Sequence, residues 1–272
     1  MSQQIRALED DIGVELFVRG SRTMKPTPQG QLLFEYAQKI LHLIEQAKVA
    51  IQTMGVEVTG PLRIGTINSI GLHLIGPVFS LFLKNNKNVK VQLHYASGLE
   101  LLRLLERGEL DLAVLPDMSK EYSANPQDFN KELISKDEMW LVTAGSDREA
   151  PTHTNLLEYS KNPVVLLTDQ YPGFENHVQR EIKRTGGFLR PVFESSNVGT
   201  LKRVIESGLG WGFLPRHSIK KQVQSGRLRR VEVENENYIV DLYCYWPKNQ
   251  SMAKASEVFL KALQQQANIG PQ

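Results

Sequence analysis

The sequence contains a single cysteine, Cys244, among its 272 residues. One cysteine excludes an intramolecular disulfide framework and a cysteine metal cluster, and it fits a reducing compartment, of which the cytoplasm is the default. The chain also lacks a basic-then-apolar signal segment at its start, and no apolar run approaches the roughly 18 residues that span a bilayer. We therefore expect a cytoplasmic protein without a membrane partner.

An excess of charge of either sign is missing too. Lys and Arg number 32 and Asp and Glu number 30, which gives a formal net charge of +2. Whole-protein charge therefore does not indicate nucleic acid or an anionic membrane as a partner, and any basic surface has to be local. The hydrophobic content of 41% is that of an ordinary globular protein.

Motifs of the common enzyme classes are also absent. The six histidines show neither the H-E-x-x-H spacing of a zinc site nor a cysteine partner. The sequence has no Walker-type phosphate loop and no G-x-S-x-G nucleophile elbow. We expect a protein that is not an enzyme, with no catalytic residues, no metal and no cofactor.

The N-terminal part of the sequence follows a pattern of helix, hairpin and helix. Apolar Ile5, Leu8 and Ile12 recur at helical spacing, which predicts a helix over residues 2–13. A short β-prone stretch, a Gly-Ser turn and a second short stretch that ends at Pro26 predict a small hairpin, or wing.

Thr27 followed by Pro28 is typical of the N-cap and first turn of a second helix, which we expect over residues 28–55. Apolar residues along it follow the alternating four-and-three spacing of a coiled-coil seam for about three heptads. They are Leu33, Ala37, Ile40, Ile44, Ala47 and Ile51. The wing is too small to cover this length, so we interpret the seam as a dimerisation surface; a long helix lying on its own domain gives the same pattern.

From residue 61 onward, strands alternate with helices in two similar series. The first series has strands over 60–67, 89–96 and 110–116 and helices over 71–86 and 98–109; the second has strands over 138–146, 162–169, 190–196 and 210–215 and helices over 174–186 and 199–208. A strand over 238–246 and a helix over 252–266 close the chain. Such alternation implies parallel strands covered by helices. Strands near 139–145 and 238–246 are available to cross between the series, which predicts two lobes with a double hinge.

The segment SQQIRALEDDIGVELFVRGSRTMKPTPQGQLLFEYAQKIL resembles the end of the winged helix-turn-helix of LysR-type transcriptional regulators. These typically read S-x-x-I-x-x-L-E-x-x-L-G-x-x-L-F-x-R, then a wing, then L-T-x-x-G. The matching residues are Ser2, Ile5, Leu8, Glu9, Gly13, Leu16, Phe17, Arg19, Thr27 and Gly30. Later segments, GPLRIGT, RGELDLAV and VIESGLGWGFLP, look like parts of the family's effector-binding region, so the resemblance covers nearly the whole chain.

The resemblance implies an α/β fold class with a partial winged helix-turn-helix, a long linker helix and a two-lobed periplasmic-binding-protein-like effector domain. The implied divisions are the end of the recognition helix and the wing over 1–27, the linker over 28–55, the first lobe over 61–138 and 246–268, and the second lobe with the hinge strands over 139–245.

Family members normally have two further helices and the start of the recognition helix before this point. We therefore expect the chain as given to bind specific DNA poorly or not at all, and a version extended at the N-terminus to bind a roughly palindromic site as a dimer. The candidate DNA contacts are Ser2, Gln3 and Arg6 on the helix and Arg19, Arg22 and Lys25 on the wing. A solvated charged turn is the ordinary alternative for the wing residues.

Polar residues at the strand ends and helix starts are the candidate effector contacts, because the family places its effector between the lobes. They are Thr66, Asn68, Ser69, Ser97, Gly98, Asp169, Ser196 and Asn197, with Tyr171 beside them. With help from helix dipoles they would hold a small polar or carboxylate-bearing molecule. Any one of them can instead be a helix cap. Asp111 is interpreted as fixing a turn and Trp211 as packing.

The resulting hypothesis is a ligand-responsive bacterial transcriptional regulator whose partners are DNA, a small-molecule effector and further copies of itself in a homodimer or homotetramer. Effector binding would change the closure of the lobes or their packing in the oligomer, and so the angle between the DNA-binding heads. The alternative is a two-lobed solute-binding or sensor protein without DNA binding. A wing followed by a heptad helix argues against it, because a transport receptor has no use for either.

Overall fold

The computed structural model describes residues 3–18, 25–37, 40, 44, 58–120, 129–234, 238–248 and 250–269. The chain divides into two compact units. A smaller unit comprises Met1–Val56 with Asn268–Gln272, and a larger unit comprises Glu57–Ala267. Among the described helices, none has both the length and the apolar character needed to cross a membrane.

The smaller unit begins with helix α1 (Gln3–Ile12), which ends at Gly13 in the left-handed conformation (φ +76°) that favours glycine. An antiparallel bridge between Phe17 and Pro26 forms the base of a hairpin. Residues 28–37 are helical, as are residues 40 and 44. The predicted first helix, the start of the second helix and the base of the wing are therefore confirmed, whereas the wing tip and much of the linker lie outside the described residues.

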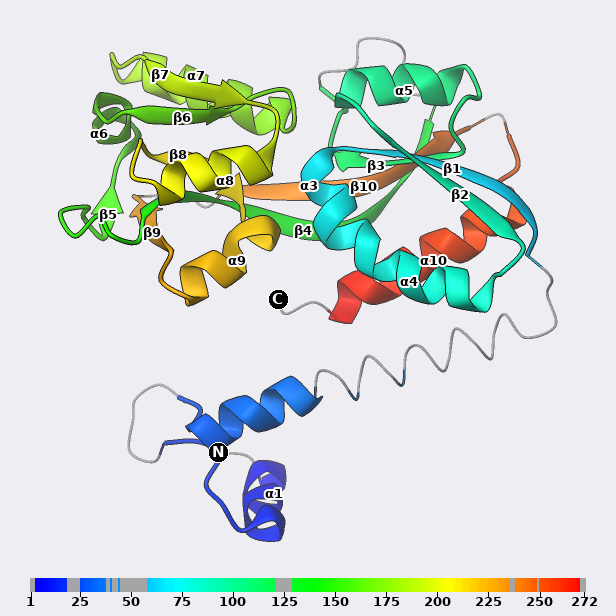
Figure 1. Cartoon of the computed structure of the whole chain (residues 1–272), viewed down its shortest axis with the longest axis horizontal. Coiled ribbons are helices and arrows are strands. Elements are labelled where there is room, and N and C mark those ends of the chain that lie inside the picture. The colour runs from blue at the N-terminus through cyan, green and yellow to red at the C-terminus, as the bar shows by residue number, and fades with distance from the viewer. Residues whose placement is uncertain are drawn as a thin grey trace. The chain divides into compact units, whose positions relative to one another are not determined.

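The larger unit is built on a mixed sheet of eight strands in the order β2-β1-β3-β10-β4-β9-β5, with β8 paired to β4 beside this path. Two long antiparallel strands, β4 (Phe129–Ala144) and β10 (Ile239–Pro247), pair along their length and run between two lobes (Figure 1). The predicted double connection between the lobes is present.

The first lobe contains the parallel strands β1 (Gly60–Thr66), β2 (Val89–Tyr95) and β3 (Leu112–Pro116). Its helices are α3 (Asn68–Ile70), a π-helical turn η1 (Gly71–Ile75), α4 (Gly76–Asn85), α5 (Gly98–Glu106) and α10 (Lys254–Ile269). The first three form one continuous helical run. α4 and α10 pack side by side, since Phe79 and Phe82 both contact the ring of Phe259, with centroids 5.2 and 5.3 Å away (Figure 1).

The second lobe contains β5 (His153–Thr154), β8 (Gly212–Pro215) and β9 (Leu228–Val233), together with a separate parallel pair, β6 (Val164–Leu167) and β7 (Pro191–Ser195). Its helices are α6 (Leu156–Lys161), α7 (Pro172–Arg184), α8 (Val198–Glu206) and α9 (Arg216–Gln224). Edge-to-face contacts of Phe213 with Tyr159, Phe174 and Tyr238, at 5.2 to 5.3 Å, form the aromatic part of its core.

Several boundaries differ from the sequence predictions for physical reasons. The strand expected over 138–146 is the second half of β4, which begins at Phe129. The first half is rich in charged residues and largely exposed, so it carries no apolar signal; it is a strand because β10 pairs with it. The predicted lobe boundary at 138/139 falls inside β4. The elements β5, α6, α9 and β9 were not predicted, because they are short or mostly polar.

Candidate functional site

The motif residues of the smaller unit hold its backbone together. Glu9 is buried, and its carboxylate Oε1 accepts hydrogen bonds from the backbone N–H groups of Leu16 at 2.7 Å and Phe17 at 3.2 Å. At Gly30, an added Cβ would lie 2.0 Å from the carbonyl oxygen of Leu16, so the close approach of the two segments requires glycine. Thr27 caps the second helix, since its Oγ1 accepts the Gly30 N–H at 3.0 Å.

The candidate DNA contacts that the structure describes are accessible. Gln3 and Arg6 are exposed one helical turn apart on α1, and Lys25 is exposed at the base of the hairpin. Ser2, Arg19 and Arg22 lie outside the described residues.

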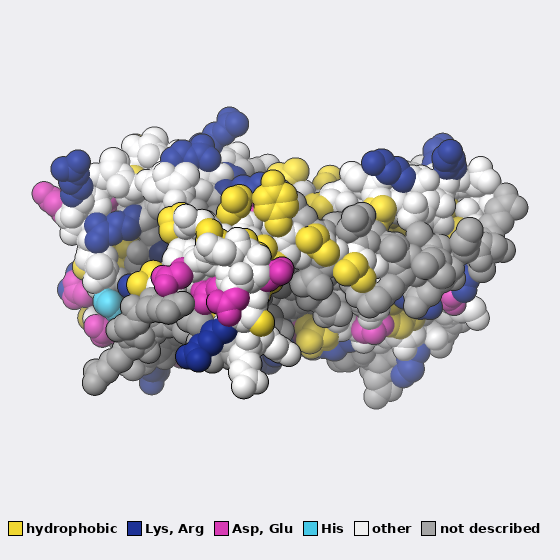
Figure 2. All heavy atoms as spheres, turned by 90° about the horizontal axis from the view of Figure 1, so that it is seen from below, with side chains coloured by type: hydrophobic (Ala, Val, Ile, Leu, Met, Phe, Trp, Pro, Cys, Tyr) yellow, Lys and Arg dark blue, Asp and Glu magenta, His cyan; other side chains and the backbone are white. Residues whose placement is uncertain are grey.

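Apolar side chains are exposed in the smaller unit. Of the predicted dimerisation seam, Ile40 is 57% and Ile44 is 47% exposed, whereas Leu33 and Ala37 are partly buried. Ala47 and Ile51 lie outside the described residues. Figure 2 shows apolar side chains gathered among charged ones on the face that it presents. Exposed isoleucines one turn apart on a helix are suited to a partner helix.

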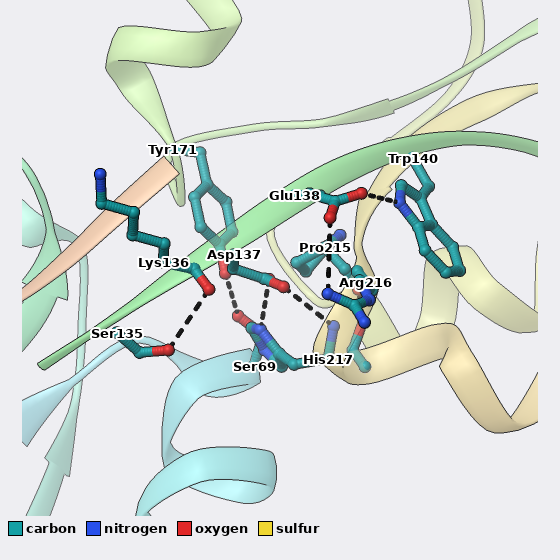
Figure 3. Close-up of polar contacts among 11 residues, drawn as sticks. Ser69, Ser135, Lys136, Asp137, Glu138, Trp140, Tyr171, Pro215, Arg216 and His217 are labelled. Carbon is teal, nitrogen blue, oxygen red and sulfur yellow. Dashed lines mark hydrogen bonds and ion pairs between the residues drawn. The ribbon is translucent and has the colours of Figure 1, made fainter. Parts of the chain in front are cut away.

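A polar cluster connects the two lobes, and we refer to its five residues, Ser69, His73, Asp137, Tyr171 and His217, as the interlobe junction. Ser69 comes from the first turn of the helical run after β1, and Tyr171 from the turn after β6. The Ser69 Oγ and Tyr171 hydroxyl oxygens are 2.9 Å apart, and both residues are 1% exposed (Figure 3). This hydrogen bond joins the first lobe directly to the second.

His217, at the start of α9, is fixed by Asp137 of β4. The imidazole Nδ1 donates to Asp137 Oδ2 at 2.6 Å, and the His217 backbone N–H donates to Oδ1 at 3.3 Å. His73 of the π-helical turn lies beside it, with ring centroids 5.8 Å apart. Burial, together with the positive charges of His217, Lys202 and Lys221, lowers the pKa of His73 to about 4.

The turn that carries Tyr171 is held by Glu175. Its carboxylate accepts the backbone N–H groups of Asp169 at 3.0 Å, Gln170 at 3.1 Å and Tyr171 at 2.8 Å. Asp169 has a φ of +61°, a conformation that aspartate tolerates better than most residues. Burial raises the pKa of Glu175. These hydrogen bonds fix the position of the Tyr171 backbone independently of the contact between its hydroxyl and Ser69.

The structure assigns internal partners to several of the candidate effector residues. Thr66 is buried, and its hydroxyl donates to the carbonyl of Val114, which ties β1 to β3. Ser97 and Asn197 are the N-caps of α5 and α8, as the capping alternative allows. Gly98 is buried where a Cβ would lie 2.8 Å from Met118 Sδ.

Asn68, Asp169 and Ser196 are partly or fully exposed. Within the part of the chain that the structure describes, Ser69 is the member of the candidate set whose side chain hydrogen-bonds to the opposite lobe. All eight residues stay predicted effector contacts.

Asp111 and Trp211 have the structural roles expected for them. Asp111 accepts the backbone N–H and the guanidinium of Arg63, each at 2.7 Å, and thereby fixes the turn before β3. This hydrogen bond raises the pKa of Arg63. Trp211 is 7% exposed, and its backbone bonds to Pro163 and Val165.

Sequence reasoning missed three members of the interlobe junction, His73, Asp137 and His217. Asp137 lies in the polar half of β4, and His217 opens a short helix of mostly polar residues, so neither stands out locally. Nearby, Glu138 accepts the indole N–H of Trp140 at 2.7 Å and pairs with Arg216 at 3.4 Å (Figure 3).

A separate open depression of about 900 Å³ lies in the second lobe. Its lining includes Thr143, Asp147, Glu158 and Trp211, and none of the candidate effector residues. Asp147 is engaged by Thr143 and Ala150, and Glu158 by Lys161. These acidic groups therefore have partners within the lobe.

A two-lobed α/β unit with crossing strands and a polar junction between the lobes has the architecture of a periplasmic-binding-protein-like sensor domain. Residues 56–268 match the family model described as the LysR substrate binding domain, and residues 1–31 match that of the bacterial regulatory helix-turn-helix protein, lysR family. The chain belongs to the LysR family of transcriptional regulators. Members of this family bind DNA and small-molecule effectors and form oligomers.

Relatives and solved structures agree with this assignment. The chain is 26% identical over 262 residues to the uncharacterized HTH-type transcriptional regulator YwqM of Bacillus subtilis, covering 96% of this chain and 87% of that protein. It is 29% identical over 232 residues to a hydrogen peroxide-inducible genes activator of Pectobacterium carotovorum, covering 82% and 72%.

Among solved structures, the LysR family regulator HinK of Pseudomonas aeruginosa has the same fold, with a TM-score of 0.65, 18% identity, and coverage of 97% of this chain and 86% of that one. DarR of Vibrio fischeri in complex with DNA gives a TM-score of 0.60 at 22% identity, with coverage of 96% and 87%. These likenesses show the fold.

Proposed function

We propose that this protein is a cytoplasmic regulator that senses a small polar or carboxylate-bearing effector at the interlobe junction and conveys the lobe arrangement to DNA-binding heads paired by the linker helices. The alternative of a solute-binding protein without DNA binding is disfavoured, because the helix-turn-helix family match includes the first 31 residues.

The observation that carries the effector site is the position of Ser69. The N-cap of its helix is Ile67, which has an apolar side chain and makes no side-chain cap hydrogen bond. The first-turn N–H groups and the Ser69 hydroxyl therefore form a group of donors at the contact between the lobes, which suits an acceptor such as a carboxylate. Lys202 and Lys221, whose charges act on His73, add positive charge to this region.

The proposal is tested by thermal shift and calorimetry with a panel of small carboxylates and neutral polar metabolites on the wild type and Ser69→Ala. We expect a ligand that stabilises the wild type. When the comparison is made in proteins that also carry Tyr171→Phe, so that Ser69 has no interlobe hydrogen bond to lose, Ser69→Ala should lower its affinity at least about fivefold, the factor that corresponds to one net hydrogen bond. Ser207→Ala, at the C-cap of α8, is the control and should bind like the wild type. Equal affinity in both variants would place the effector elsewhere.

Oligomerisation and DNA binding are tested separately. In our proposal the seam residues, including Ile40 and Ile44, pair two copies. Gln3 and Arg6 belong to the recognition helix, and Lys25 of the wing lies along the phosphate backbone. In a version extended at the N-terminus, neutralising Lys25 should weaken binding equally for different DNA sequences and reduce its salt dependence, because phosphate contacts carry no sequence information. A change in sequence preference without loss of affinity would contradict this role.

A further inference from the structure

The hydroxyl of Tyr171 is hydrogen-bonded to Ser69, the residue on which the proposed effector site depends. Its hydroxyl lies 2.9 Å from Ser69 Oγ, and its side chain is almost completely removed from solvent. When Ser69 is the donor of this bond, an acceptor that engages the Ser69 hydroxyl proton has to take this position from the phenol. Burial raises the pKa of the Tyr171 hydroxyl, so the phenol stays neutral and keeps its proton.

The hydrogen bond is supported on both sides by rigid backbone. On the side of the second lobe, the three backbone hydrogen bonds to Glu175 fix the turn at Tyr171. On the side of the first lobe, Gly71 lies two residues after Ser69, and a Cβ there would lie 2.4 Å from the ring of Tyr95. Neither partner can follow the other far if the lobes separate, so opening breaks the bond.

The second contact between the same helical run and the second lobe is of a different kind. His73 and His217 face each other as rings, and His217 directs its Nδ1 to Asp137 rather than to His73. This pair adds van der Waals contact but no hydrogen bond in the described structure. Among the described residues, the hydrogen bond that holds the helical run to the second lobe is therefore the Ser69–Tyr171 bond.

We propose that the Ser69–Tyr171 hydrogen bond is a built-in latch between the lobes, which an effector must release in order to bind Ser69. The latch makes Tyr171 a residue that sets the threshold of the response, because the free energy of the bond is subtracted from the affinity of any ligand that displaces it. This inference rests on the proposed effector site for its role in signalling, whereas the latch itself is a property of the two lobes.

The latch is tested by measuring the separation of the lobes in solution. Spin labels are attached to the full chain at Lys84→Cys on α4 and Lys183→Cys on α7, both exposed positions, and the distance distribution is recorded by pulsed electron resonance. Cys244 is fully buried and its burial raises the pKa of its thiol, so it does not compete for the label. The comparison is between the labelled chain and the same chain with Tyr171→Phe.

We expect Tyr171→Phe to raise the fraction of separated lobes about fivefold, as loss of one net hydrogen bond predicts. Ser69→Ala should do the same, and the double variant should match either single variant because both remove one bond. Tyr243→Phe on β10 removes a hydroxyl outside the junction and should leave the distribution unchanged. An unchanged distribution in folded Tyr171→Phe, or additive effects in the double variant, would overturn the latch.

The two proposals fail in different ways. If Tyr171→Phe separates the lobes but the affinity of no carboxylate or polar ligand depends on Ser69, the proposed position of the effector site is wrong and the latch is supported. If a ligand depends on Ser69 while Tyr171→Phe neither separates the lobes nor increases the affinity for that ligand, the latch is overturned and the effector site stands.

Discussion

His217 donates through Nδ1 to the carboxylate of Asp137 at 2.6 Å, and the same carboxylate accepts the backbone N–H of His217. The pair joins the start of α9 to β4, one of the two strands that connect the lobes. Pro215, the N-cap residue of α9, has no side-chain acceptor, so Asp137 supplies the one that the helix start lacks.

Removing this carboxylate should destabilise the second lobe. Asp137 is 7% exposed, so Asp137→Ala leaves two N–H groups of His217 without their acceptor in a mostly buried site. We expect a loss of about 2 to 3 kcal/mol in the free energy of unfolding, measured in urea. Asp241→Ala, which removes an exposed ion pair with Lys136 at 3.9 Å, is the control and should cost less than about 1 kcal/mol. Equal losses in the two variants would contradict the capping role.

Lowering the pH should destabilise the interlobe junction, because His73 becomes protonated there. Because the pKa of His73 is about 4 in the folded protein and 6.5 ordinarily, the unfolded chain binds the proton more readily. The stability that this residue contributes is fully present above pH 6.5 and is lost as the pH falls towards 4. The groups that face it, His217, Lys202 and Lys221, add repulsion once His73 is protonated.

The measurement is urea unfolding at pH 7 and pH 5 for the wild type, His73→Gln and His153→Gln. We expect His73→Gln to lose less stability between the two pH values than the wild type. His153, which is exposed and pairs with Glu232, provides the matched control, and its substitution should change the pH dependence less than His73→Gln does. The raised pKa of Glu175 acts in the opposite direction but is common to all three proteins. An unaltered pH dependence in His73→Gln would refute the assignment.

Glu9 should be required for the fold of the smaller unit. Glu9→Ala leaves the N–H groups of Leu16 and Phe17 without their acceptor, one of them buried, and we expect this unit to lose about 2 kcal/mol of stability. Amide hydrogen exchange at Leu16 and Phe17 should become faster, while exchange in the larger unit stays the same. Asp10→Ala, at an exposed neighbouring position, should have no such effect. Unchanged protection in Glu9→Ala would show that the carboxylate is dispensable.

The seam should determine the oligomeric state. Ile40→Asp/Ile44→Asp places two charges on the exposed apolar positions of the second helix, and burying such charges at a helix pair is costly. Light scattering after size exclusion should show at least a tenfold weaker association than the wild type. Gln31→Asp, an exposed position outside the seam on the same helix, controls for charge alone. If the double variant associates like the wild type, the oligomer forms through another surface.

The local sequence pattern was sufficient to predict the helices and strands whose apolar residues recur at a regular spacing. The spacing of Ile5, Leu8 and Ile12 predicted α1, and the alternation of apolar strands and amphipathic helices predicted most of the larger unit. The roles of Asp111 and Thr27 also followed from position, because a cap or a turn depends on residues only a few positions away along the chain or on an adjacent strand.

What the sequence by itself determined is therefore the order of elements, the two lobes and the family resemblance, all of which depend on short-range spacing. Tertiary structure alone decided that Ser69 meets Tyr171, that Asp137 holds His217 and that the polar half of β4 is a strand. These features depend on groups brought together from distant segments, and a polar side chain carries no local sign of which distant partner will satisfy it.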